Sequence, residues 1–226
     1  LVANDNIESH AIILQYHRFD ESKYPSTDIS MELFTTQIEY LAKNNYNVMP
    51  LSKIVNYLMQ KKELPPKTVA ITMDDAYESV YSKAYPLLKK YKFPFTVFVN
   101  SSPIIHHSKH YASWEDMREM GANGAEFANH TYTHQYLVRM DANDSKNYEK
   151  DVTKEIEKSE AQLEVALPVY KKMEDKLVQT SNGSEALKSE CRYIKAAYHK
   201  IGDINVQNSG QCYLIEGKYC AKMRDG

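Results

Sequence analysis

The feature that most constrains the fold of this 226-residue chain is a short apolar run, Thr68–Met73, that ends in two adjacent acids. The run lies between Pro65-Pro66 and a helical pattern, and its β-branched and apolar residues predict a buried strand. Asp74 and Asp75 then fall at the carboxyl end of that strand, where α/β folds carry their functional residues. The alternative is that both acids cap the next helix at its positive N-terminus.

Strand and helix patterns alternate on both sides of this run. Residues 11–17, 95–99 and 125–129 are further apolar runs that predict buried strands. Apolar residues at helical spacing predict helices over 31–44 and 78–91. Short links between these patterns favour βα units around a parallel sheet. We therefore expect an α/β protein built on an incomplete or distorted (β/α) barrel.

The alternation stops near residue 168. Beyond it, two helical patterns are followed by short hairpin-like strands over 203–222. We therefore predict one domain over 1–167 and a divergent C-terminal α+β segment over 168–226, of uncertain role. A tail that is foreign to the domain, through truncation, frameshift or fusion, is the alternative.

Charge and hydropathy exclude two classes of partner. The formal net charge of −2 leaves no electrostatic footprint for nucleic acid or an anionic membrane. No apolar run approaches the roughly 20 residues of a membrane-spanning helix. The chain has no signal-peptide pattern, but it opens at Leu1 rather than Met, so we expect processing or trimming and an extracellular or periplasmic location. The sequence does not indicate the oligomeric state.

The three cysteines, Cys191, Cys212 and Cys220, all lie near the C-terminus. A disulfide between Cys212 and Cys220 would close a predicted hairpin and favour an oxidising compartment. Three free thiols fit the sequence equally well. In either case Cys191 has no partner within the chain.

A second polar motif follows the predicted strand over 125–129. His130-Thr131-Tyr132-Thr133-His134 places two imidazoles four residues apart. If the segment is one helical turn, both rings lie on one face and meet a single metal ion. Such a histidine pair on its own is more often solvated, but here we expect Asp74 and Asp75 at the same edge of the sheet, which we call the rim. Two imidazoles and one carboxylate make a metal site with a position left for water, and the second acid is free to act as a base.

These two motifs resemble those of the polysaccharide deacetylases with the NodB-homology domain, carbohydrate esterase family four. Thr72-Met73-Asp74-Asp75 matches the family's Thr-Phe-Asp-Asp apart from Met for Phe, and 130–134 matches His-Ser/Thr-x-x-His. The surrounding context also matches at Tyr16-His17, at 93–99 and at Ser113-Trp114. The resemblance covers roughly residues 8–165.

The resemblance implies roles for four residues of the two motifs. Asp75, His130 and His134 would bind a divalent metal ion, most often zinc, and Asp74 would be the general base. The implied reaction is hydrolysis of N-acetyl groups, a carbon–nitrogen bond that is not a peptide, on an N-acetylhexosamine polysaccharide. An O-acetyl polysaccharide is the chemical alternative.

Two further residues are candidates for substrate contact. His17 ends a predicted strand on the same rim as Asp74, and the alternative is a satisfied core histidine. Trp114 is placed to stack on a sugar ring, whereas a Trp at a helix start more often packs into the core.

The sequence departs from the family at its third and late motifs. Where Arg-x-Pro-Tyr/Phe-Gly is expected, residues 166–171 read Ala-Leu-Pro-Val-Tyr-Lys, without the Arg and the Gly. The late histidine motif that supplies the general acid is not recognisable, and His199 is the only histidine of the tail. A non-catalytic glycan-binding or structural protein that keeps the fold is therefore the alternative to an enzyme.

Overall fold

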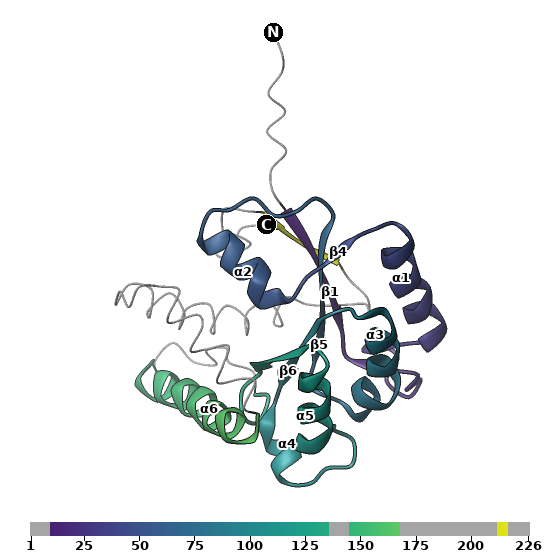
Figure 1. Cartoon of the computed structure of the whole chain (residues 1–226). Coiled ribbons are helices and arrows are strands. Elements are labelled where there is room, and N and C mark those ends of the chain that lie inside the picture. Colours follow the sequence, from purple (N-terminus) through teal and green to yellow (C-terminus); the bar gives the residue numbers. More distant parts are fainter. Residues whose placement is uncertain (1–9, 136–144, 168–211, 217–226) are drawn as a thin grey trace.

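The computed structural model describes residues 10–135, 145–167 and 212–216 (Figure 1). The strands are β1 His10–Tyr16, β2 Arg18–Phe19, β3 Asp28–Ile29, β4 Asn47–Val48, β5 Thr68–Asp74, β6 Phe95–Val99, β7 Ala125–Asn129 and β8 Cys212–Glu216. The helices are α1 Met31–Lys43, α2 Leu51–Met59, the π-helix η1 Val80–Ala84, α3 Tyr85–Tyr91, α4 Ser101–Ile105, α5 Trp114–Ala122 and α6 Ser145–Ala166.

The main sheet has the strand order β7-β6-β5-β1-β8. The first four of these strands are parallel, and β8 pairs antiparallel with β1. β4 pairs with the first two residues of β5, and β2 and β3 form a small sheet of their own. Strands β1, β5, β6 and β7 lie in the sheet in the order in which they occur along the chain, which is the winding of a (β/α) barrel. The predicted α/β class with an incomplete barrel is confirmed, and the sheet is open among the described residues.

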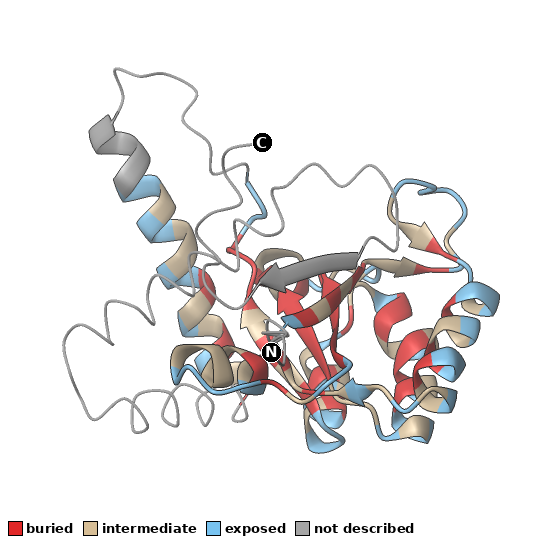
Figure 2. Cartoon of the chain, turned by 90° about the horizontal axis from the view of Figure 1, so that it is seen from above, coloured by how far each residue is buried: buried red, intermediate tan, exposed pale blue. Residues whose placement is uncertain are grey.

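Helices cover both faces of this sheet, with α2 opposite α1 and α3 (Figure 1). On one face, α1, α3 and α5 bury Phe34, Leu88 and Met117 in the larger core. On the other face, Ile54 of α2 packs in a smaller core with Ile13 of β1. The strands between them are buried along most of their length (Figure 2). Each such side chain contributes roughly 1.5–3 kcal/mol on burial, so the sheet is a rigid platform for whatever its ends carry.

The helix predicted over 78–91 forms in two pieces. Residues 80–84 are a π-helix, and α3 follows at Tyr85 with Pro86 in its first turn. Proline has no N–H to donate to the carbonyl four residues earlier, so the hydrogen-bond pattern changes just before it. The helix begins at residue 78, as predicted, and contains a π-helical segment before its regular part.

The C-terminal part of the chain enters the sheet through β8, which pairs with β1 rather than within a described hairpin. The two helices and the rest of the hairpin predicted beyond 167 lie outside the described residues, as do Cys191 and Cys220. The boundary at 167 and the disulfide therefore stay predictions.

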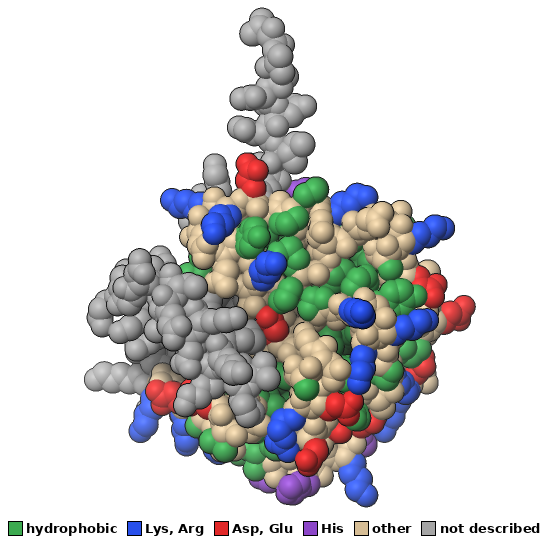
Figure 3. Space-filling model, viewed as in Figure 1, with side chains coloured by type: hydrophobic (Ala, Val, Ile, Leu, Met, Phe, Trp, Pro, Cys, Tyr) green, Lys and Arg blue, Asp and Glu red, His purple; other side chains and the backbone are tan. Residues whose placement is uncertain are grey.

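Figure 3 shows basic and acidic side chains interspersed over one face of the described molecule, without a field of one sign. In the part of the chain that the structure describes, none of the helices has the length and apolar character to span a membrane.

Candidate metal centre

The carboxyl ends of four parallel strands meet at one edge of the sheet. The register pairs Asp74 with Phe98 and Phe98 with Ala128, so β5, β6 and β7 end side by side. β1 lies on the other side of β5 and ends at Tyr16, so His17 follows at the same edge. The acid pair and the histidine pair therefore share one rim, as the strand pattern predicts.

Residues 74–77, which we call the acid loop, turn sharply at the end of β5. Asp74 is the last strand residue, and Asp75 and Ala76 have φ values of 70° and 56°. Consecutive non-glycine residues in this left-handed region cost of order 1–3 kcal/mol each and persist where the surroundings enforce them. All three residues are buried. Successive residues of an extended strand point to opposite faces, and this turn breaks that alternation directly after Asp74.

The carboxylate of Asp74 is held by the neighbouring strand rather than by a helix. Its Oδ2 accepts a hydrogen bond from Nε2 of Gln15 on β1, and Nε2 of His17 lies 3.7 Å from the same oxygen. The backbone N–H groups of Glu78 and Val80 donate to the carbonyls of His110 and Tyr77 rather than to either acid. The interpretation of the two acids as helix caps is therefore wrong.

Residues 130–134, which we call the histidine loop, are not helical. Thr131 and His134 have φ values of 66° and 60°. Thr131 donates its N–H to Oδ1 of Asn129 at 2.8 Å, and His134 donates its N–H to Oγ1 of Thr131 at 3.1 Å. Side chains that bond the nearby backbone in this way compete with a helix. The helical turn considered as one way to bring the two rings together does not form, yet the two imidazoles still meet, with ring centroids 4.8 Å apart.

Helix α6 clamps the histidine loop from the side. Oε2 of Glu155 accepts hydrogen bonds from the N–H and the Oγ1 of Thr133, at 2.7 Å and 2.8 Å. The ammonium of Lys158 lies 3.6 Å above the ring centroid of Tyr132. Nδ2 of Asn129, the last residue of β7, donates to the carbonyl of Ile156 at 3.0 Å. The loop is therefore fixed by a helix that begins fifteen residues after His130.

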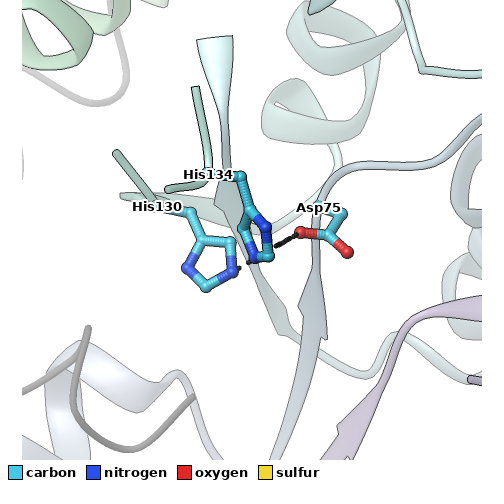
Figure 4. Close-up of side chains that lie close together, drawn as sticks. All are labelled: Asp75, His130 and His134. Atoms are coloured by element: carbon cyan, nitrogen blue, oxygen red, sulfur yellow. Dashed lines mark ion pairs between the residues drawn. The ribbon is translucent and has the colours of Figure 1, made fainter. Parts of the chain in front are cut away.

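One carboxylate and two imidazoles converge between the two loops (Figure 4). Oδ1 of Asp75 lies 3.5 Å from Nε2 of His130 and 3.3 Å from Nε2 of His134. Ligands about 2.0–2.1 Å from a tetrahedral zinc ion lie roughly 3.3 Å from one another, so these spacings suit one ion. Buried Oδ1 of Asp75 has no hydrogen-bond partner among the described residues, which leaves it available to a metal.

One side of the cluster is buried, and the other side is exposed to solvent. The side chains of Asp75 and His130 are 8% and 9% exposed, whereas that of His134 is 54% exposed. Phe98, the cross-strand partner of Asp74, contacts the ring of His130 at a centroid distance of 6.1 Å. Solvent or a substrate therefore reaches the cluster past His134.

Tyr77 and Arg18 extend the surroundings of the acid loop. Burial first, and then the negative charge of Asp75, raise the pKa of Tyr77 well above its ordinary value. The guanidinium of Arg18 stacks 3.3 Å above the centroid of the Tyr77 ring, and Arg18 also pairs with Glu21 at 2.8 Å. The Tyr77 hydroxyl is therefore neutral and protonated at physiological pH.

The two candidates for substrate contact lie in different settings. His17 is at the rim beside Asp74, with a side chain 20% exposed. Trp114 is the first residue of α5 and packs partly buried against the larger core. The residues that the third motif would supply, from 168 onward, lie outside the described residues. Sugar contacts by His17 and Trp114 stay predictions.

Three residues around the site were not singled out from the sequence. Gln15 carries the one detectable signal, since it is a lone amide in the apolar run Ala11–Tyr16. Tyr77 and Glu155 carry none, because a tyrosine after an acid pair and a glutamate in a charged helix are both ordinary.

The fold and the cluster together define a class: an α/β protein with a candidate mononuclear metal centre at the carboxyl edge of its parallel sheet. A family model described as polysaccharide deacetylase matches residues 61–197. Because this match covers more than half of the chain, the chain belongs to the polysaccharide deacetylase family, as the two motifs predict.

Individual proteins that are similar to this chain are also deacetylases. Poly-β-1,6-N-acetyl-D-glucosamine N-deacetylase of Staphylococcus aureus (strain MRSA252) is 30% identical over 175 residues, covering 69% of this chain but 60% of that protein. The Streptococcus pyogenes deacetylase PplD, solved in complex with acetate, has 25% identity and a TM-score of 0.62 over 71% of this chain and 70% of its own. IcaB from Ammonifex degensii has 28% identity and a TM-score of 0.60 over 71% and 70%.

Proposed function

We propose that this chain is a metal-dependent hydrolase that removes N-acetyl groups from an N-acetylhexosamine polysaccharide. The observation that carries the proposal is the cluster of Asp75, His130 and His134, whose ligand atoms all lie within 4.8 Å of one another. The family match and the named substrate of the Staphylococcus aureus relative support the choice of substrate class. We propose zinc as the ion because one carboxylate and two imidazoles are a frequent catalytic zinc set.

Bound there, the ion would supply an acidified water and a positive charge opposite the acetyl carbonyl. The chain's own residues supply the remaining chemistry. Asp74 is the general base: its Oδ2 is engaged by Gln15, and among the described residues nothing hydrogen-bonds its Oδ1. Oδ1 therefore accepts the proton of the attacking water. Oδ1 is not among the fully buried atoms without a partner, so a water molecule can reach it although the residue as a whole is buried.

His17 and Trp114 take supporting roles in this proposal. His17 lies 3.7 Å from Asp74 and is partly open to solvent, which suits contact with the sugar that carries the acetyl group. Trp114 offers the one indole of the chain for stacking on a neighbouring sugar. We further propose an extracellular or periplasmic location, and a deacetylase domain over 1–167 to whose sheet β8 of the C-terminal segment adds an edge strand.

Acetate release tests the proposal. The full chain, loaded with zinc, is incubated with acetylated glycans: β-1,6- and β-1,4-linked N-acetylglucosamine oligomers and an O-acetylated polysaccharide. We expect release from an N-acetylated oligomer and a fall of roughly 100-fold or more in Asp74→Asn, since a general base contributes 10²–10⁴-fold. Release of acetate from the O-acetylated polymer alone would mean that the chain is an esterase rather than an amidase. Equal background release by both proteins would instead favour a non-catalytic glycan-binding protein.

A further inference from the structure

Gln15 is a buried amide at a position where the sheet otherwise buries apolar groups. On β1, Ala11 and Ile13 point to the same face and belong to the smaller core. Gln15 continues that series and is 7% exposed. A buried amide is costly unless both of its ends are satisfied, and Oε1 of Gln15 has no partner among the described residues. An apolar residue would serve the core better, so the reason for the amide lies elsewhere.

The other end of the amide is engaged with the proposed base. Gln15 pairs with Thr72, and Asp74 is two residues further along β5 on the same face, so the amide reaches diagonally to the carboxylate. A carboxylate only accepts hydrogen bonds, so the amide must present Nε2 to Oδ2. This choice is what turns Oε1 away without a partner. The hydrogen bond to Asp74 is therefore made at a cost to the stability of the core.

That hydrogen bond restricts the terminal side-chain torsion of Asp74. The terminal torsion of an aspartate is broad, so a carboxylate without partners samples many orientations. The Gln15 amide fixes Oδ2, with His17 beyond it at 3.7 Å, and thereby fixes the direction of Oδ1. A neutral amide does this without placing a second charge beside the base.

We propose that Gln15 is a positioning residue that orients the Asp74 carboxylate so that Oδ1 faces the attacking water. This inference rests on the proposed function of Asp74 as the base. It assigns to a residue of β1 a role that neither the acid motif nor the histidine motif contains.

The test compares three variants of the full chain, each loaded with zinc. Gln15→Met keeps the volume and loses the donor, and Gln15→Glu keeps the shape and replaces the donor with an acceptor. Thr72→Val is the matched control: Thr72 is the buried register partner of Gln15, and its hydroxyl bonds the carbonyl of Leu14 at 3.0 Å, away from Asp74. The amount of bound zinc is measured for each protein, kcat and KM are measured on an N-acetylglucosamine oligomer, and crystal structures of the wild type and of Gln15→Met are determined.

In Gln15→Met we expect a roughly 10-fold or larger fall in kcat, with KM within about twofold and zinc unchanged, since orientation of the base matters to the transition state alone. Gln15→Glu falls at least as far, Thr72→Val keeps its kcat, and the Asp74 carboxylate rotates in the crystal. Wild-type kcat in Gln15→Met, or an equal loss in Thr72→Val, overturns the proposal.

Failure of the proposed function gives a different pattern. In that case the wild-type chain binds zinc but releases no acetate from any glycan. The positioning role is then decided by the two crystal structures. An Asp74 carboxylate with the same orientation in wild type and Gln15→Met overturns it, and a reoriented carboxylate supports it.

Discussion

The acid loop and the histidine loop supply the same cluster by different means. Both loops contain two left-handed residues, but in the acid loop these are consecutive, buried and directly after β5, so its backbone turn is built into the end of the strand. The histidine loop ends at the exposed His134 and is shaped by side chains, above all by Glu155 of α6. One half of the site is thus part of the sheet, and the other half depends on the docking of the next described helix along the chain.

This difference predicts which substitutions lower the affinity of the site for a metal ion. A backbone-built loop keeps its shape when a neighbouring side chain is trimmed, whereas a clamped loop loses its shape with the clamp. Removing a residue that hydrogen-bonds a metal ligand, rather than the metal itself, typically lowers metal affinity by 10–100-fold. We expect such losses around the histidine loop and much smaller ones around the acid loop.

The largest effect is expected from Asp75→Asn, which removes the ligand that the acid loop contributes. Zinc affinity, measured by competition with a chelating dye, should fall by roughly 100-fold or more, since an outer partner alone is worth 10–100-fold. The metal-free chain should keep its unfolding free energy within about 1 kcal/mol, because Oδ1 has no hydrogen bond to lose. Asp151→Asn, an exposed change on α6, is the control. Tight zinc binding by Asp75→Asn would remove the acid loop from the site.

The next effect tests the clamp. Glu155→Gln exchanges a charged acceptor of two hydrogen bonds for a neutral one, so the loop that carries His134 loosens. Zinc affinity should fall by about 10-fold while the thermal unfolding of the metal-free chain changes little. Glu157→Gln, an exposed change two residues along the same helix, should leave affinity unchanged. An equal fall in both variants would mean that the charge of α6 matters and the clamp does not.

A smaller effect is expected inside the histidine loop. Thr131→Val removes the hydroxyl that accepts the N–H of His134, and one hydrogen bond is worth about 1 kcal/mol, or roughly fivefold in zinc affinity. Thr131→Ser keeps the hydroxyl and should bind zinc as the wild type does. A loss of affinity in Thr131→Ser, with wild-type affinity in Thr131→Val, would mean that the packing of the methyl group rather than the hydrogen bond holds the loop.

The smallest effect is expected from Tyr77→Phe in the acid loop. The hydroxyl is neutral and lies near Asp75, but the backbone turn already fixes that ligand. Zinc affinity should therefore stay within about twofold, since only an outer contact is lost. A tenfold loss would show that the acid loop also depends on a side-chain partner, and the contrast between the two loops would disappear.

The sequence predicts the strand ends well and the loops poorly. Apolar runs ending at Asp74 and Asn129 were enough to place both motifs on one rim, because parallel strands end at the same edge. The local shape of the histidine loop was not predictable from the spacing of its histidines. That shape is set by Asn129, Thr131 and Glu155, and the last of these is brought to the loop only by tertiary packing.

Gln15 illustrates what a single sequence conceals. Its position within an apolar strand was visible, but its partner lies 59 residues away, on a neighbouring strand whose register the sequence does not state. Register decides whether the amide meets Asp74 or an apolar neighbour.

Metal analysis of the full chain, prepared without chelators, tests the central claim most directly. The account predicts close to one zinc, cobalt or nickel ion per chain, as a single site with one carboxylate and two imidazoles requires. The same preparation of Asp75→Asn should contain almost none. A wild-type chain without a bound transition metal, or an Asp75→Asn chain with as much metal as the wild type, would contradict it.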